Sequence, residues 1–219
     1  MSKIIHFVPN EPDDNHCFQA SFMMAVEALG GERLDMQAAE RLTNFVADCP
    51  TWPYKGLLSL ADRGLYVRYT EDFSLRRFIT APKELIFEHV NDPQIAEEVI
   101  RKSDFSVEAV FAQACLEHPQ ITIDERRPKL DDLKRELSLG SLAIVNVNYF
   151  RLLEKVGYAG HFVVVEAVDE EEVLLQNPGL PPIPNQRVAM ATFLAAWHFP
   201  NDRLANIIAI RATPFQFGI

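Results

Sequence analysis

The stretch over residues 13–31, DDNHCFQASFMMAVEALGG, constrains the fold most because it predicts one long helix with a cysteine in its first turn. Residue types that cap helices occupy positions 13–15, apolar side chains repeat at helical spacing over Phe18–Leu29, and Gly30-Gly31 supplies a stop. The unpaired N–H groups and the positive dipole end of a first helical turn favour a thiolate over a thiol. We therefore expect Cys17 to have a lowered pKa and to act as a nucleophile.

A partner base for this thiol occurs far downstream, in the stretch GHFVVVEAVDEEEVLLQNPG over residues 160–179. Two apolar, β-branched runs flank an acidic turn, which predicts an antiparallel hairpin centred near Asp169. A symmetric register would place His161 directly opposite Asn177 on the same face of the hairpin. An amide in that position can hold one imidazole tautomer and direct the other ring nitrogen at a thiol, as the third member of a catalytic triad does.

These features together resemble the papain-like cysteine peptidases, and within them the branch of bacterial bacteriocin-exporter leader peptidases (double-glycine peptidase-like). The resemblance is carried by Cys17 opening a helix, by the Gly-His pair that starts the strand GHFVVV, and by an Asn-Pro-Gly sixteen residues after the histidine. It covers the helix around Cys17 and most of residues 128–197. It implies an α+β fold with an N-terminal helical lobe packed on an antiparallel β-sheet lobe. It also implies a soluble thiol hydrolase with Cys17 as nucleophile, His161 as general base and then acid, and Asn177 as the residue that orients the imidazole.

The sequence departs from this family's pattern at two positions beside the nucleophile. Papain-like enzymes usually carry a glutamine six residues before the cysteine, whose amide and the cysteine N–H stabilise the oxyanion, and here that position is Glu11. Asn10, one residue upstream, is the candidate donor instead, with Glu11 directed to solvent. The branch also has glycine after the cysteine, where this chain has Phe18. Three functions therefore stay open: peptide or amide hydrolysis, acyl transfer by the same triad, and peptide binding by an inactive domain of the same fold.

Composition bounds the architecture and the partners. A chain of 219 residues with 48% apolar residues can bury a full core, so we expect one domain over residues 1–219, mainly helical up to residue 120 and sheet-rich over 121–219. The formal net charge of −10 argues against nucleic acid, which leaves a peptide or related amide as the expected partner. No apolar run is long enough for a membrane span or a signal segment, and the chain lacks the membrane and ATP-binding parts of an exporter. Three cysteines without framework spacing favour a reducing cytoplasm without disulfides.

The remaining motifs argue against other chemistries. No HExxH or CxxC pattern indicates a metal, and no GxGxxG or phosphate loop indicates a nucleotide cofactor, so we expect neither. His16 is a poor base for Cys17 because neighbours on a helix point about 100° apart. Cys49 is expected in a loop and Cys115 on a packed helix face. The other histidines of the middle region, His89 and His118, are expected to be exposed and without a catalytic part.

The spacing of apolar residues, together with capping residues, glycines and prolines at the ends of segments, predicts the remaining helices and strands. Helices are expected over 35–47, 54–62, 93–102, 104–117, 129–139 and 192–197, strands over 4–8, 65–69, 121–123, 142–147 and 206–212, and a proline-rich turn over 178–184. The helix at 104–117 and the segment before it are expected to wall the substrate cleft.

Overall fold

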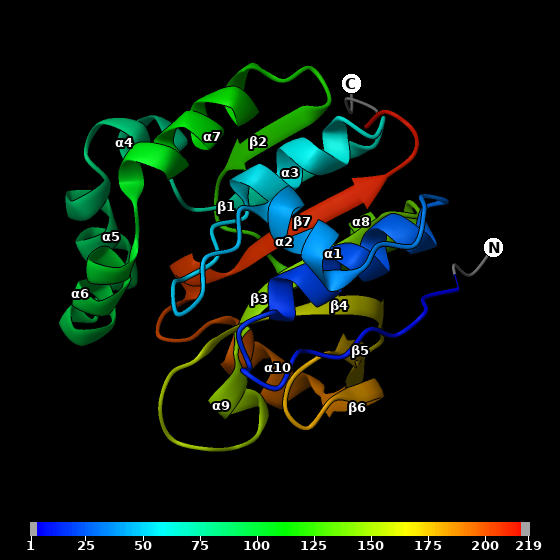
Figure 1. The fold of residues 1–219 in the computed structure, drawn as a ribbon. Coiled ribbons are helices and arrows are strands. Elements are labelled where there is room, and N and C mark those ends of the chain that lie inside the picture. Colours follow the sequence, from blue (N-terminus) through cyan, green and yellow to red (C-terminus); the bar gives the residue numbers. More distant parts are fainter. Residues whose placement is uncertain (1–3, 216–219) are drawn as a thin grey trace.

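The computed structural model describes residues 4–215, which form one seven-stranded sheet with helices on both faces (Figure 1). The strands are β1 (Tyr66–Glu71), β2 (Ile121–Glu125), β3 (Leu142–Asn148), β4 (Gly160–Val168), β5 (Glu172–Asn177), β6 (Ile183–Ala189) and β7 (Asn206–Arg211). The helices are α1 (Cys17–Ala28), α2 (Met36–Thr43), α3 (Tyr54–Ala61), α4 (Leu75–Thr80), α5 (Pro82–Val90), α6 (Pro93–Lys102), α7 (Phe105–Glu117), α8 (Leu130–Ser138), α9 (Tyr149–Leu152) and α10 (Met190–Trp197), with a 3-10 turn at Asp202–Leu204. Among residues 4–215, none of these helices has the length and apolar character needed to cross a lipid bilayer.

The sheet runs in the order β2-β1-β7-β3-β4-β5-β6 and joins the two halves of the chain. The β1 strand belongs to the part of the chain expected to be mainly helical, and it pairs antiparallel with β7 near the C-terminus, where Glu71 lies opposite Asn206. Its other neighbour, β2, runs parallel to it, whereas the remaining pairs are antiparallel. The predicted α+β class is confirmed, although the sheet is mixed and reaches into the helical part.

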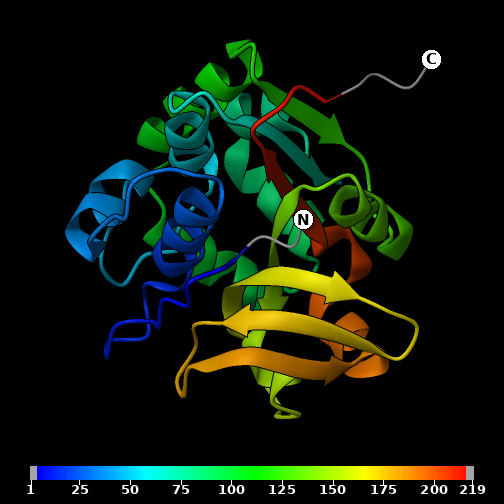
Figure 2. The same cartoon turned by 90° about the vertical axis from the view of Figure 1, so that its right-hand side faces the viewer.

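Two apolar cores lie on opposite faces of this sheet because side chains alternate along each strand. Within β3, Leu142 and Ile144 enter the core beneath α1–α7, while Val145 and Val147 enter the core beneath α8–α10. Burying one such side chain contributes about 1.5–3 kcal/mol relative to leaving it exposed. Apolar contacts therefore hold helices on both faces of the sheet. Figure 2 shows β4, β5 and β6 side by side at one end of the molecule.

The α1 helix occupies the centre of the first core, as its apolar sequence predicts. The helix start differs from the expected one, in which a residue of 13–15 caps the helix. His16 takes the N-cap position, and its side chain makes no capping hydrogen bond. The side-chain oxygen of Asn10 accepts the His16 N–H at 2.7 Å instead. At the other end, Gly30 adopts a φ of 87° and the N–H of Gly31 donates to the Val26 carbonyl, which completes the glycine stop.

Two sequence predictions of local structure are wrong. Residues 4–8 do not form a strand, because they run as an irregular segment towards the loop before α1. The proline-rich stretch at 178–184 was expected to be a turn, but β6 begins within it at Ile183 and forms the edge of the sheet. An edge strand tolerates Pro184 because half of its N–H groups have no ladder partner to lose.

Candidate active site

Cys17 is the first residue of α1 and lies on the wall of a cavity of about 450 Å³. Its Sγ accepts a hydrogen bond from the backbone N–H of Phe162, the third residue of β4, at 3.5 Å. The helix is held against this strand by a second bond, in which the Ser21 hydroxyl donates to the Phe162 carbonyl at 3.3 Å. The N–H groups at a helix start have no partner within the helix, so the Cys17 N–H is a donor beside the sulfur.

His161 precedes Phe162 on β4, and its Nε2 is 2.8 Å from the Oδ1 of Asn177 at the end of β5. The expected contact between the two side chains is present, but the symmetric register that led to it is wrong. Val164 pairs with Gln176 and Val165 with Leu175, and a bulge shifts the pairing before Ala167. His161 and Asn177 are thus diagonal neighbours, a separation that long side chains bridge.

Backbone contacts assign the tautomer of His161. The N–H of Gly179 donates to Asn177 Oδ1 at 3.0 Å, so that atom is an acceptor, and Asn177 Nδ2 donates to Gln186 Oε1 at 2.7 Å. The Nε2 of His161 must therefore carry the proton that it shares with Asn177, which leaves Nδ1 as the basic nitrogen. Gln186 on β6 was missed because no strand was expected after the proline-rich turn at 178–184.

Two further residues hold His161 in place and were also missed. The Tyr149 ring packs on the imidazole with centroids 4.4 Å apart. Its other side lies so close to Gly179 that an added Cβ would approach the ring to 2.6 Å. The Oδ1 of Asn146 accepts the backbone N–H of His161 at 2.9 Å. These contacts come from β3 and α9, outside the strand that carries His161, so no local pattern indicated them.

Burial sets the charge state of the candidate pair. Loss of hydration raises the pKa of the Cys17 thiol to about 11, and the nearby Asp14 carboxylate adds to that rise. Burial also lowers the pKa of His161 to about 4, against the opposing effect of its bond to Asn177. The lowered thiol pKa expected from the helix start is therefore wrong for this state, because desolvation outweighs the backbone N–H groups. Near neutral pH the site holds a thiol and a neutral imidazole.

Asn10 lies in the loop before α1 and is 7% exposed. Its Oδ1 accepts the N–H groups of His16 and Glu11, and its Nδ2 donates to Asp14 Oδ1 at 2.8 Å. The Glu11 side chain is exposed, as expected. Asp14 was missed as a site residue, although it lines the same cavity as Cys17. One hydrogen of the Asn10 amide thus has a partner already.

Phe18 is a packing residue in this chain. Phe18 is 1% exposed, and its ring packs against that of Phe162 in a tilted arrangement with centroids 4.7 Å apart. On its other side, a Cβ added to Gly56 would approach the Phe18 ring to 2.7 Å. The residue after the nucleophile therefore points into the core below α3.

The remaining cysteines and histidines have varied surroundings. Cys115 is buried and its thiol donates to the Tyr54 carbonyl, whereas Cys49 lies in a loop on the wall of the same cavity as Cys17. The two ring nitrogens of His16 contact the carboxylates of Asp13 and Glu40, which keeps its role local. His89 was expected to be exposed, but it is 3% exposed because α5 packs it against the Phe73 ring.

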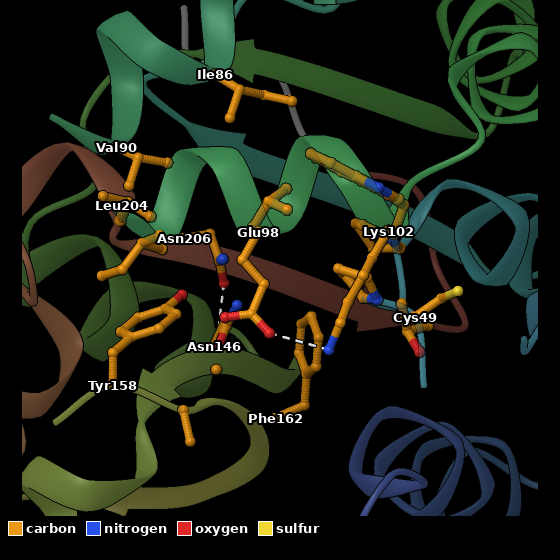
Figure 3. A pocket seen from close by; sticks show the side chains of 18 of the residues that line it. Cys49, Ile86, Val90, Glu98, Lys102, Asn146, Tyr158, Phe162, Leu204 and Asn206 are labelled. Atoms are coloured by element: carbon orange, nitrogen blue, oxygen red, sulfur yellow. Dashed lines mark hydrogen bonds and ion pairs between the residues drawn. The ribbon is translucent and has the colours of Figure 1, made fainter. Parts of the chain in front are cut away.

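The cavity beside Cys17 lies between the ends of strands β1, β7, β3 and β4 and the helical segment before α7 (Figure 3). Ile86, His89 and Val90 come from α5, and Ile95, Glu98, Val99 and Lys102 come from α6. The segment before the 104–117 helix walls the cavity as expected, whereas no lining residue within 4–215 comes from α7 itself. The described residues hold no group of three or more His, Cys, Asp or Glu side chains placed to bind a metal ion.

Comparisons with known proteins identify the fold and the family of the chain. The peptidase domain of Streptococcus ComA, described as a bi-functional ABC transporter involved in a quorum-sensing pathway, has a similar structure, with a TM-score of 0.51 and 12% sequence identity. The match covers 97% of this chain and 100% of that domain, and it shows that the fold is papain-like. No curated protein sequence matches the chain. Residues 13–196 match the Peptidase_C39 like family, and because this span includes most of the chain, the protein belongs to that family.

Proposed function

We propose that this chain is a cysteine peptidase-like hydrolase that cleaves a peptide or related amide bond with Cys17, His161 and Asn177. The observation that carries the proposal is the tautomer of His161, whose Nε2–H is held by Asn177 so that Nδ1 is free to accept a proton. The proposal is further supported by the position of Cys17, the first residue of α1, against the strand that carries His161.

In this mechanism His161 Nδ1 takes the proton from Sγ as the sulfur attacks the carbonyl carbon. This is general-base catalysis, because the raised pKa of Cys17 and the lowered pKa of His161 favour the neutral pair before attack. The Cys17 N–H and the second hydrogen of the Asn10 amide stabilise the developing oxyanion. The imidazolium then protonates the leaving amine. Water, deprotonated by His161, finally resolves the thioester and restores the thiol.

One observation favours a second candidate, an inactive peptide-binding domain. The Asn10 amide already donates to Asp14, and the carboxylate of Asp14 raises the pKa of the Cys17 thiol. If the amide stays on Asp14 when a peptide binds, the oxyanion lacks its second donor. The domain would then hold a peptide without cleaving it.

Asn10→Ala tests whether Asn10 is the second oxyanion donor of the hydrolase. Loss of an oxyanion donor lowers kcat by about 100–1000-fold, and loss of the three hydrogen bonds of a buried amide lowers the free energy of unfolding by about 1–3 kcal/mol. The matched control Glu11→Gln changes an exposed neighbour and is expected to alter neither quantity appreciably. Steady-state kinetics and urea unfolding measure the two effects. A destabilised Asn10→Ala protein with unchanged kcat would limit Asn10 to a structural role.

The test of the proposed function is direct detection of the acyl-enzyme and its products. The full-length protein is incubated with a peptide library, with and without an added primary amine, and quenched in acid for mass spectrometry. We expect a mass increase on Cys17 and hydrolysis products that are absent with Cys17→Ala. Amine-transfer products in place of hydrolysis would identify acyl transfer, and peptide binding without either product would identify the inactive domain.

A further inference from the structure

A row of polar groups extends from Cys17 across four neighbouring strands, β4, β3, β7 and β1, at one end of these strands. Glu71 on β1 lies opposite Asn206 on β7, and Asn206 Oδ1 accepts the N–H of Asn146 on β3 at 2.9 Å. Asn146 in turn lies opposite Phe162 on β4, whose N–H donates to Cys17 Sγ. All five residues line the cavity, and Figure 3 shows Asn146 and Asn206 joined by their hydrogen bond, with Glu98 and Phe162 in the same cavity.

The far end of this row holds the carboxylate of Glu71, whose side chain is 12% exposed. Tyr69, two residues before Glu71 on β1, donates its hydroxyl to Glu71 Oε2. No lysine or arginine within residues 4–215 pairs with Glu71, and its one charged neighbour there is His89, with Nε2 at 3.6 Å from Oε1. The charge of Glu71 also acts on Tyr158. Burial raises the pKa of Tyr158 to about 12, and the negative charge of Glu71 adds to that rise.

His89 lines the same cavity beside Glu71. Its ring is 3% exposed and packs edge-on against Phe73, yet neither ring nitrogen has a hydrogen-bond partner among the described residues. Buried polar groups in native proteins are nearly always paired. An imidazole that lines a cavity without a hydrogen-bond partner on either ring nitrogen, beside a carboxylate with no lysine or arginine partner among residues 4–215, is therefore the wall of a polar binding site.

The charge of the cavity selects the ligand. Its walls carry the carboxylates of Asp14, Asp48, Glu71 and Glu98 against the single ammonium of Lys102, which is itself bonded to Glu98 at 2.9 Å. A low-dielectric cleft of one sign concentrates ligands of the opposite sign. The corner at Glu71 thus suits a cation that donates hydrogen bonds, namely a primary ammonium or a guanidinium.

We propose that Tyr69, Glu71 and His89 form a subsite for a lysine or arginine side chain of the substrate. This proposal rests on the proposed function in taking the ligand to be a peptide. Glu71 and Phe162 are three strand spacings apart, or about 14 Å, and an extended peptide advances about 3.3 Å per residue. The basic residue therefore lies within about four residues of the bond at Cys17.

The test measures binding to the full-length Cys17→Ala variant, so that turnover does not interfere. The probes are fluorescent decapeptides of alanine and serine with one lysine at successive positions, and a matched set with norleucine, which keeps the aliphatic chain and lacks the ammonium. At one position we expect lysine to bind at least about 10-fold more tightly than norleucine. Equal affinities at every position would overturn the proposal.

Variants of the two cavity carboxylates then locate the subsite. Glu71→Gln is expected to abolish the lysine preference, whereas the control Glu98→Gln retains it, because that carboxylate is 60% exposed and paired with Lys102. The assignment of the subsite to Glu71 would be overturned if the lysine preference persisted in Glu71→Gln, or if both variants lost it equally. If Glu71→Gln does not fold, His89→Phe keeps an aromatic ring on Phe73 and is expected to weaken the preference several-fold, and an unchanged preference contradicts the subsite.

These results are independent of peptide cleavage. A lysine preference in Cys17→Ala, without any cleavage by the wild-type protein, would support the subsite and reject the hydrolase. Cleavage of lysine and norleucine peptides with equal kcat/KM would support the hydrolase and reject the subsite.

Discussion

Cys17→Ala is expected to lower kcat by on the order of 10⁶-fold, as loss of a triad nucleophile does in comparable enzymes. The expected change in stability is small, because Sγ makes one weak hydrogen bond, to the Phe162 N–H at 3.5 Å. Single-turnover kinetics on a cleaved library peptide and urea unfolding measure the two effects.

Cys49→Ala is the matched control for this variant, since Cys49 lies on the wall of the same cavity. It is expected to leave kcat unchanged. Alkylation by iodoacetamide adds a second control: labelling of Cys17 should accelerate as the pH rises towards about 11, because burial raises the thiol pKa to that value. Turnover that survives in Cys17→Ala, or is lost in Cys49→Ala, would move the nucleophile elsewhere.

His161→Phe is expected to lower kcat by a similar order of magnitude, about 10⁶-fold, because base and nucleophile act as one unit. In the wild-type protein, burial lowers the pKa of His161 to about 4, so kcat/KM should stay level to low pH and fall only as the imidazole becomes protonated near pH 4. An acid limb near pH 6.5 would show that the base is a hydrated histidine instead.

The same pKa predicts how stability depends on pH. Between pH 6.5 and about 4 the unfolded chain binds a proton at His161 that the folded protein does not, so the free energy of unfolding falls as the pH is lowered through this window. The shift from 6.5 to about 4 corresponds to a loss of about 3 kcal/mol. Urea unfolding at pH 7 and pH 4 measures it, and His161→Phe should remove this share of the loss. An equal loss in the variant would assign it to other groups.

Elements with a strong local signal were predictable from sequence. The α6 helix runs over Pro93–Lys102 as expected, because Asp92 caps the N–H groups of Gln94 and Ile95 and proline suits a first helical position. The α1 helix and the β4–β5 hairpin followed from apolar periodicity in the same way. Residues 4–8 show the limit of this reasoning, since an apolar run becomes a strand only where a neighbouring strand offers hydrogen bonds.

By itself, the sequence determined the residue types and their order: a cysteine at a helix start, a histidine opening a buried strand, and an asparagine at the end of the next. These depend on contacts within one or two elements. The tertiary structure decided what surrounds them, including the bulge that offsets His161 from Asn177, the Tyr149 ring and Gln186. It also decided the burial of His89 beside Glu71. Burial and cross-sheet hydrogen bonds arise from segments far apart in the chain, so pKa values and cavity chemistry follow from packing rather than from local pattern.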